Sequence, residues 1–388
     1  MPRRLYYIDW LRVLAVLLLF PFHTSRVFNF GEDFYIKSSE LSVVLGYILG
    51  FISMWHMQLL FLLAGASAYF SLRRRTGRQF AGERLARLGV PFVFGLFVIM
   101  PPQTWVGAQF NSGYTGSFVQ YITSGAFLKF DKFGPEGDYY GGFGIGHLWF
   151  IVVLLLISLI VLPLFTWGRR ERGGIAMARF SRALGRPVWW LVPAVLIFIG
   201  EAFPDPTGLG IFYYLVFFVL GFVAVCDEAF MESAERHWRW ALVVGMAGCA
   251  VWDASWRFRD SLADPSLALA GVNLLGALLT WIAIVGLLGA GRRWLDRPSP
   301  SLPYLAESSY PVYILHQTVI VVAAFYLLEV LPSILWIQWV VILAVAVVVT
   351  FALYEIVRRA GVLRFLFGMR PKPAPDAVAA TPQVETPG

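Results

Sequence analysis

The sequence has few cysteines, no internal repeat and no leader-like cleavage site. Its two cysteines, Cys226 and Cys249, lie in or beside apolar segments without paired spacing, so they say nothing about disulfides and little about the redox compartment. No internal repeat stands out, which removes one usual indication of a secondary transporter. No small-x-small motif follows the first apolar run, and that run contains Arg12 and His23. We therefore do not expect a cleaved signal peptide.

Long apolar runs dominate the sequence instead. Hydrophobic residues make up 58% of the 388 positions, whereas soluble domains are about 45–50% apolar. Several runs exceed the roughly 18 apolar residues needed to cross a bilayer. We predict an all-α integral membrane protein with about ten transmembrane helices in one domain, residues 1–370, followed by a disordered Pro/Ala-rich tail at 371–388. The predicted spans are 9–29, 41–70, 88–110, 145–168, 188–204, 209–226, 238–256, 267–290, 310–330 and 335–358.

Basic residues are distributed unevenly between the predicted loops. Of the 31 Lys and Arg residues, 24 fall on one predicted side of the membrane, six on the other, and Arg12 within it. This asymmetry places both termini in the cytoplasm, and it explains the net charge of +7 without nucleic acid as a partner. The longest loop on the other side, 111–144, carries Asp131, Glu136 and Asp138. Its aromatic residues are expected to pack on the membrane surface or, less readily, on a sugar ring.

Polar residues inside the spans are the functional candidates. A charged group at a helix centre costs on the order of 2.5–3.5 kcal/mol on insertion scales. Four of the five histidines lie within or at the edge of a span, and only His237 is in a basic loop. With Arg12, they are predicted to extend from the inner edge to the outer edge of the membrane, which suits a path through the bundle. The four are His23, His56, His147 and His316.

The first span carries two of these polar residues. Arg12 and His23 are 11 residues apart, which places them on the same helix face, about 16 Å apart along the axis. Asp9 precedes Arg12 by three residues and is predicted to pair with it. Pro21 is expected to bend the helix beside His23. The structural alternatives are snorkelling of Arg12 to the interface and an interhelical hydrogen bond for His23.

Other candidates occur in three later segments. His147 and Trp149 open the fourth span, where an aromatic belt is the simpler explanation. His56 and Gln58 are predicted near the middle of the second span. His316 is predicted close to the cytoplasmic end of the ninth span, with Tyr313 on the same face.

Arg84 and Arg87 lie one turn apart on a segment that leads into the third span. Two guanidinium groups at this spacing can clamp a phosphate. The candidate ligands are an anionic lipid and a nucleotide-bearing cofactor, and the alternative is a plain orientation signal.

These residues resemble those of the acyltransferase 3 family of multi-pass membrane acyltransferases. The resemblance rests on YIDWLR at 7–12, His23 after Arg12, the Arg84-x-x-Arg87 pair, FLLAGASAYFSL around Gly65 and SSYPVYILHQT around His316. PFHTS, HMQLLFLLAGASAYFSLRRR and HLWF are most similar to the branch that includes the glucan-succinylating glucans biosynthesis protein C. Ala64 and His56 depart from the usual pattern, and the second departure leaves the acyl group open between acetyl and succinyl.

The resemblance implies transfer of an acyl group from cytoplasmic acyl-CoA to a hydroxyl of a carbohydrate or small molecule on the far side of a bacterial inner membrane. His23 is then the catalytic histidine, and Arg12, paired with Asp9, holds it or the donor. Arg84 and Arg87 handle the donor, with His316 and Tyr313 along its route. His147, Trp149, His56 and Gln58 are candidates for the acceptor side.

A neutral imidazole suits this chemistry because it can take the hydroxyl proton near pH ~7. Tyr313 or Gln58 is our candidate donor to the oxyanion, and an acyl-histidine intermediate is the alternative route. We expect no metal and no resident cofactor. The alternative function is a transporter or exporter of a small molecule or glycan intermediate, although the sequence shows no obvious pair of broken helices.

Overall fold

The computed structural model describes residues 5–128, 137–262 and 266–371. In these ranges all regular elements are helices, and the only β pairing is one isolated bridge between Asn29 and Ser42. The first helices are α1 (Tyr6–Arg26), α2 (Val43–Ser53), α3 (His56–Leu72), α4 (Gly77–Arg84), η1 (Leu85–Gly89), α5 (Val90–Phe94), η2 (Gly95–Ile99), α6 (Met100–Ser112), α7 (Phe118–Thr123), η3 (Ala126–Leu128), η4 (Gly137–Tyr140), η5 (Gly146–Leu148), α8 (Trp149–Ile160) and α9 (Leu162–Gly168). The others are α10 (Glu171–Leu184), η6 (Pro187–Trp190), α11 (Leu191–Ala202), α12 (Ile211–Ala224), α13 (Glu228–Ala254), α14 (Trp256–Asp260), α15 (Leu267–Leu295), α16 (Leu302–Val330), α17 (Leu335–Val357) and α18 (Gly361–Leu366).

The described residues contain six to nine candidate membrane spans. Six continuous runs are long and apolar enough to cross a bilayer: Tyr6–Arg26, Val43–Leu72, Gly77–Ser112, Leu267–Leu295, Leu302–Val330 and Leu335–Val357. Three bent pairs bring the number to nine: Gly146–Ile160 with Leu162–Gly168 (50°), Glu171–Leu184 with Pro187–Ala202 (109°) and Ile211–Ala224 with Glu228–Ala254 (103°). The chain is therefore an all-helical, multi-pass membrane protein. The count of about ten spans and the cytoplasmic termini stay predictions.

The sequence shows no obvious pair of broken helices, whereas the described residues contain these three bent pairs. The break after α8 precedes Pro163, and Pro187 follows the break after α10. Proline lacks the backbone N–H that would continue the helix. At the third break, the Asp227 side chain accepts from the Ala229 N–H at 3.0 Å and caps a new helix. Local sequence therefore explains each bend.

Small residues bring two helix pairs into close contact. A Cβ added to Gly65 of α3 would lie 1.8 Å from the Phe218 carbonyl oxygen of α12, and one added to Gly221 would lie 1.9 Å from the Leu62 carbonyl oxygen. Gly286 of α15 similarly faces the backbone of Leu242 in α13. Close backbone approach of this kind is typical of helix pairs in membranes. It gives the Gly65 motif a packing role.

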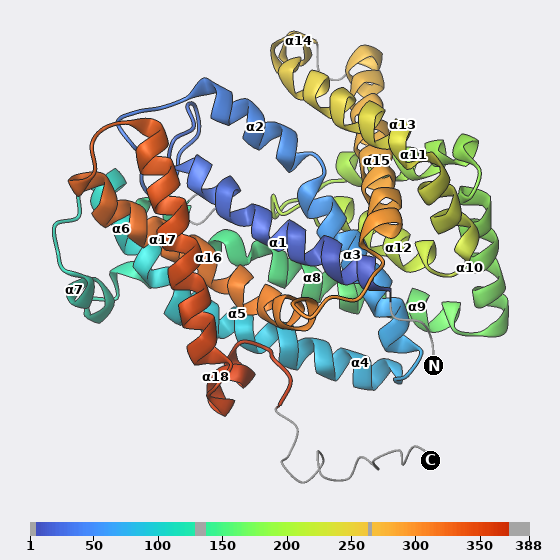
Figure 1. Ribbon diagram of the computed structural model, residues 1–388, viewed down its shortest axis with the longest axis horizontal. Coiled ribbons are helices and arrows are strands. Elements are labelled where there is room, and N and C mark those ends of the chain that lie inside the picture. The colour runs from blue at the N-terminus through green and yellow to red at the C-terminus, as the bar shows by residue number, and fades with distance from the viewer. Residues whose placement is uncertain (1–4, 129–136, 263–265, 372–388) are drawn as a thin grey trace, which may run out of the picture.

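Helix α1 lies across the centre of the bundle (Figure 1). It packs against α15, α16 and α17, and more lightly against α2 and α3. Because residues along its whole length are buried between these neighbours, both Arg12 and His23 are held by tertiary packing. The site is therefore built around α1.

Helix α16 begins at Leu302, eight residues before the predicted start of its span. Hydropathy placed the boundary at residue 310 because Glu307 and two serines precede it. In the structure, the Glu307 carboxylate accepts from Arg364 Nη2 at 2.8 Å and from the Tyr354 hydroxyl at 3.2 Å. The ion pair and hydrogen bond let the helix continue through this segment, and His316 lies near the middle of α16.

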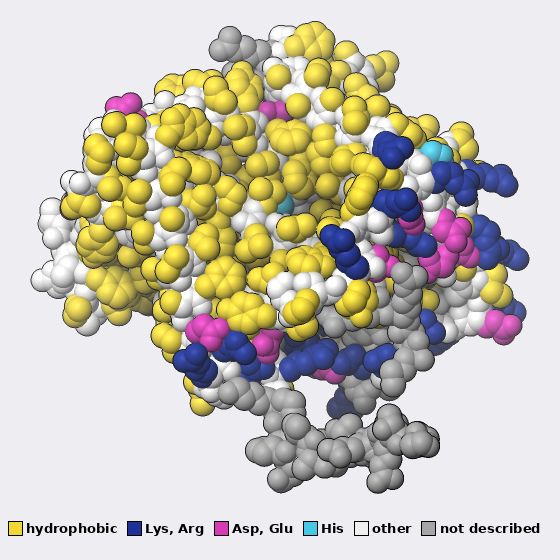
Figure 2. Space-filling view, viewed as in Figure 1, with side chains coloured by type: hydrophobic (Ala, Val, Ile, Leu, Met, Phe, Trp, Pro, Cys, Tyr) yellow, Lys and Arg dark blue, Asp and Glu magenta, His cyan; other side chains and the backbone are white. Residues whose placement is uncertain are grey.

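Hydrophobic and basic side chains occupy different parts of the surface (Figure 2). Hydrophobic side chains cover most of the face shown, and Lys and Arg gather along the lower and right-hand edges, where α4, α10 and α18 lie in Figure 1. The predicted disordered tail at 371–388 lies outside the described residues except for Pro371. Arg3 and Arg4, part of the predicted basic side, also lie outside them.

Candidate functional site

Four histidines from four separate elements gather in one region, where His23 and His316 interact electrostatically with each other and with both His56 and His147. The His23 and His316 ring centroids are 5.0 Å apart, and those of His147 and His316 are 5.4 Å apart. His316 was predicted near the inner edge of the membrane and His23 near the outer edge, and this separation is wrong. Because α16 starts earlier than predicted, His316 lies near the middle of this helix, beside His23 of α1. We call His23, His56, His147 and His316 the histidine cluster.

Hydrogen bonds fix the tautomer of His147. Its Nε2 lies 2.8 Å from the Ile314 carbonyl oxygen, which can only accept, so Nε2 carries the proton. Its Nδ1 is then an acceptor, and the Gln103 amide donates to it at 3.4 Å. The Gln317 amide in turn donates to Gln103 Oε1 at 3.3 Å. Both nitrogens of His147 are therefore occupied, and this network connects η5, α6 and α16.

His316 has one nitrogen bound and one open. Its Nδ1 lies 2.6 Å from the Tyr313 carbonyl oxygen and must donate to it. Its Nε2 is therefore a lone-pair acceptor, and it has no hydrogen-bond partner among the described residues although the side chain is only 1% exposed. A buried polar atom without a partner is uncommon in proteins and calls for an explanation.

His23 also has an open buried nitrogen. Its Nδ1 has no hydrogen-bond partner among the described residues. Its ring stacks on Phe34 at 6.5 Å and meets Phe22 edge-on at 5.1 Å. These contacts fix the plane of the imidazole without using Nδ1. The interhelical hydrogen bond considered for His23 is therefore not made by that atom.

The remaining predicted acceptor-side residues are held by other contacts. His56 begins α3 and donates from Nε2 to the Ala15 carbonyl at 2.6 Å. Trp149 packs on Tyr214 at 5.1 Å rather than on a histidine of the cluster. Gln58 donates its amide protons to the Ser53 carbonyl and the Tyr213 hydroxyl, at 3.0 and 3.1 Å.

These contacts change the predicted oxyanion donors. The Tyr313 hydroxyl donates to the His147 carbonyl, and Gln58 has only its oxygen open. A hydroxyl has one proton to donate and an amide two. Neither Tyr313 nor Gln58 has a free donor for an oxyanion in this conformation, so that assignment is corrected.

Arginine side chains gather at the other end of α1. Arg12 Nη1 donates to Asp9 Oδ1 at 3.3 Å, as predicted, and Nη2 donates to Ser67 Oγ at 2.7 Å. Arg84 lies in the electrostatic range of Arg12, Arg87 and Tyr310. The Tyr310 hydroxyl is buried without a hydrogen-bond partner among the described residues. We call Arg12, Arg84 and Arg87 the arginine cluster.

The arginine cluster is too far along α1 to touch His23. Eleven residues of helix separate the two by about 16 Å. This distance excludes direct support of His23 by Arg12 and leaves donor binding as its predicted role. The Arg12 side chain is 32% exposed, so a ligand can reach it.

One residue of the arginine cluster lies in an unusual helical turn. Arg87 lies in the π-helix η1, and a second π-helix, η2, follows α5. Such turns are rare and frequently occur at functional sites. Arg87 Nε donates to the Gly368 carbonyl at 3.1 Å, and the Arg84 guanidinium lies 4.8 Å from the Phe80 ring.

Two loop segments cover the histidine cluster near His23. Tyr35 donates to the Asp138 carboxylate and Tyr140 to that of Asp33, which joins residues 27–42 to residues 137–140. Burial, together with the negative charge of Asp138, raises the pKa of Tyr35 well above its usual value. Lys37 donates two hydrogen bonds of 2.8 Å to Asn29 within the first segment and one of 2.8 Å to the Arg26 carbonyl at the end of α1.

The predicted long loop at 111–144 is partly helical and packs on the protein itself. α6 extends to Ser112, and α7 follows. Tyr139 of the predicted loop has its ring 4.8 Å from that of Tyr35, so this aromatic residue packs against the segment 27–42. Asp131 and Glu136 lie outside the described residues.

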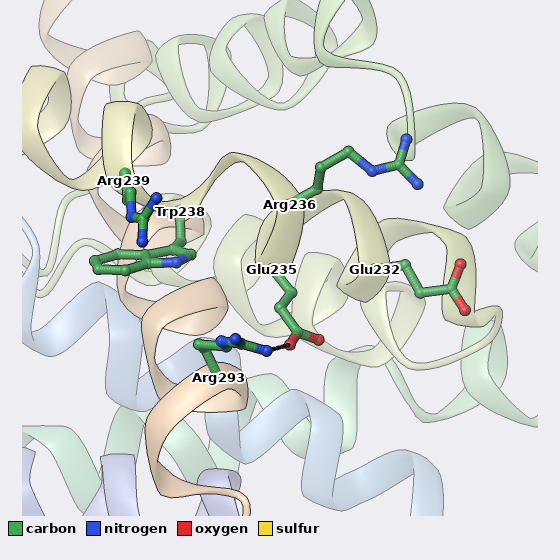
Figure 3. A pocket seen from close by; sticks show the side chains of 6 residues that line it. All are labelled: Glu232, Glu235, Arg236, Trp238, Arg239 and Arg293. Carbon is green, nitrogen blue, oxygen red and sulfur yellow. Dashed lines mark ion pairs between the residues drawn. The ribbon is translucent and has the colours of Figure 1, made fainter.

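A separate surface hollow of about 370 Å³ lies between α13 and α15 (Figure 3). Arg293 pairs with Glu235 at 3.8 Å, and the Arg239 guanidinium lies 5.5 Å from the Trp238 ring. No histidine of the cluster lines this hollow. Among the residues that the structure describes, no group of three or more His, Cys, Asp or Glu side chains is arranged to hold a metal ion.

Sequence reasoning missed the amides that support the cluster. Gln103 and Gln317 are buried at 0% and 3% exposure in apolar helices, and a buried polar residue in a span is itself a signal. Ser67 and Tyr310 were also missed because their sequence contexts are ordinary. Only the folded structure brings Ser67 to Arg12 and Tyr310 to Arg84.

Comparisons with known proteins identify the family of the chain. The acyltransferase 3 family, described as an acyltransferase domain, matches residues 5–355. Glucans biosynthesis protein C of Salmonella paratyphi A (strain ATCC 9150 / SARB42) is 23% identical over 98% of both chains, as is that of Salmonella agona (strain SL483). The protein of the same name from Salmonella heidelberg (strain SL476) is 22% identical over the same share. No solved structure matches the chain significantly. The chain belongs to the acyltransferase 3 family.

Proposed function

We propose that this membrane acyltransferase moves an acetyl or succinyl group from acyl-CoA to a hydroxyl of a carbohydrate or related acceptor. The observation that carries the proposal is the arrangement along α1. One end of this buried helix holds the arginine cluster, and the other holds a histidine with an open buried nitrogen. Phosphates and a thioester are the two parts of acyl-CoA that need such groups.

The arginine cluster suits the phosphates of the donor. Guanidinium groups bind phosphate through short charge-assisted hydrogen bonds. Arg84 and Arg87 come from one continuous helical run and Arg12 from α1, so a bound phosphate would be approached from two elements. In this proposal the basic edges of the molecule face the cytoplasm of a bacterial inner membrane.

The histidine cluster suits the reaction itself. An alcohol attacks a thioester as its proton leaves, and a positioned neutral imidazole accelerates such a transfer by typically 10²–10⁴-fold. His23 acts as this base. The loop segments that lie over His23, 27–42 and 137–140, then border the acceptor. A carbohydrate acceptor is in keeping with the relatives' printed name, which mentions glucans.

The test is acyl transfer from radiolabelled acetyl-CoA and succinyl-CoA in membranes containing the full chain or its His23→Ala variant. Label should appear in extracted glycans or lipids only with the wild-type chain. Equal labelling by both proteins would remove His23 from the chemistry. Absence of label with either donor, in membranes that contain the native acceptors, would contradict the proposed donor and acceptor classes.

A further inference from the structure

The open nitrogens of the histidine cluster occur on neighbouring rings. His23 Nδ1 and His316 Nε2 are both buried and lack partners among the described residues, and their rings are 5.0 Å apart. The other two rings differ, because His147 uses both nitrogens and His56 uses Nε2. The two rings with open buried nitrogens are therefore neighbours.

The direction of a proton transfer between them is fixed by the backbone. His316 Nδ1 donates to the Tyr313 carbonyl at 2.6 Å, so Nε2 can only accept. A proton on His23 Nδ1 therefore has an acceptor one ring away. A direct hydrogen bond after a small ring rotation, or one bridging water, spans such a gap.

Helix α16 continues from this acceptor toward the arginine cluster. His316, Tyr313 and Tyr310 repeat every three residues on α16 and share one side of it. The His316 and Tyr313 rings are 5.9 Å apart, and Tyr310 lies in the electrostatic range of Arg84 and Arg87. His316 is therefore on the α16 face that leads to the proposed donor phosphates.

We propose that His23 and His316 form a two-histidine proton relay in which His316 takes the proton that His23 gives up. This inference rests on the proposed acyl transfer and assigns His316 a role other than donor binding. The acceptor oxygen forms a bond to the thioester carbonyl carbon, and its proton passes to His23 Nε2 while the Nδ1 proton passes to His316 Nε2. The C–S bond breaks, and its electron pair leaves on the CoA sulfur.

The proton that is transferred ends on the sulfur of the donor. His316 returns its extra proton to the thiolate, which leaves free CoA thiol and neutral His316. His23 is left as its other neutral tautomer and regains the first by exchange with water. Acyl transfer removes a proton from the acceptor and delivers one to the donor, and the relay connects these two sites.

The test compares kcat and KM for acyl-CoA in the purified full chain, using wild type, His316→Gln, His23→Gln and the double variant. We expect His316→Gln to lower kcat by about 10²-fold or more with an unchanged KM. The double variant should be no slower than His23→Gln, because residues that act as a unit are not additive. His237→Gln, outside the cluster, is the matched control and should keep wild-type kcat.

A proton inventory measures how many protons are transferred in the rate-limiting step. This number would not change if His316 had only a structural role. The wild-type rate in H₂O/D₂O mixtures should indicate two transferred protons, and that of His316→Gln should indicate one. The groups that face His316 in this measurement are His23 of α1, His147 of η5, His56 of α3 and Tyr313 of its own helix.

Each other outcome overturns the relay. A raised KM with unchanged kcat would make His316 a donor-binding residue, and an additive double variant would give the two histidines separate roles. If His316→Gln fails to fold, as judged by loss of a cooperative melting transition without acyl-CoA, the same kinetics on His316→Asn decide. Failure of wild type to transfer label would contradict the proposed function, whereas an active wild type with an equally active His316→Gln contradicts the relay alone.

Discussion

The polar groups at the two ends of α1 differ in whether their hydrogen-bond partners are in place. In the arginine cluster, Arg12 is paired with Asp9 and Ser67, and Arg87 is bound to the Gly368 carbonyl. In the histidine cluster, His23 and His316 each keep an open nitrogen in an apolar setting. A side chain with its partners in place is suited to holding a ligand in one position. A side chain with an open nitrogen is suited to passing or accepting a proton.

The strongest way to break this comparison is to remove the open nitrogens of His23. His23→Gln should reduce acyl transfer by about 10²–10⁴-fold, the range for loss of a general base. Binding should survive, because the arginine cluster is intact. Thermal melting with and without acyl-CoA measures binding, and transfer of radiolabel measures activity. Loss of both together would mean that the two ends of α1 do not have separate roles.

Changing the arginine cluster should produce the opposite pattern. Arg84→Gln and Arg87→Gln should each raise KM for acyl-CoA by about 10–100-fold, since a hydrogen bond to a charged group contributes roughly 1.5–3 kcal/mol. Their effect on kcat should be small. Steady-state kinetics on purified protein measures the split.

Arg78→Gln is the matched control for that experiment. Arg78 lies on α4 with Arg84 but is exposed. It should leave KM unchanged. An equal rise in KM for all three variants would indicate general attraction of the donor to a basic surface rather than a built phosphate site.

His147→Gln tests whether occupied nitrogens matter for stability. Both nitrogens of His147 are bound, so its replacement disturbs two buried hydrogen bonds, one to the Ile314 carbonyl and one from the Gln103 amide. The expected cost is about 1–3 kcal/mol of unfolding free energy, seen as a lower melting temperature. A fall in kcat as large as that of His23→Gln, with an unchanged melting temperature, would place His147 in the chemistry instead.

Ser67→Ala should have the smallest effect. It removes one hydrogen bond from Arg12 and leaves the Asp9 pair in place. A typical net hydrogen bond is worth about 1 kcal/mol, so KM for acyl-CoA should rise only a few-fold. Steady-state kinetics beside the Arg84→Gln variant gives the comparison. No change at all would indicate that Asp9 alone orients Arg12.

Local features of the site could be predicted from the sequence. The shared face of Arg12 and His23 and the pairing of Arg12 with Asp9 depend only on helical geometry and short spacing. The same holds for the identification of four intramembrane histidines as candidates, because cost in the bilayer is a property of each residue. The family motifs added the acyltransferase assignment, which the comparisons confirm.

Features that depend on distant contacts could not be predicted. The predicted position of His316 near the inner edge was wrong because Glu307 pairs with Arg364, which is 57 residues away. This ion pair lets α16 begin earlier than the hydropathy of the sequence indicates. The Gln103–Gln317 bond joins positions 214 residues apart. The bend between Ile160 and Leu162 divides the predicted span 145–168 into two helices, and the three bent pairs give six to nine candidate spans in the described residues.

The length of α1 has a consequence for substrate choice. If the donor is bound as proposed, the fixed stretch of helix between Arg12 and His23 spans the part of the molecule that all acyl-CoAs share. This stretch fixes the position of the shared CoA part of the donor and does not distinguish one acyl group from another. Discrimination between a two-carbon and a four-carbon acyl group must then come from residues beyond His23, where Phe34 stacks on the imidazole and the Arg26 guanidinium lies 5.4 Å from the Phe34 ring.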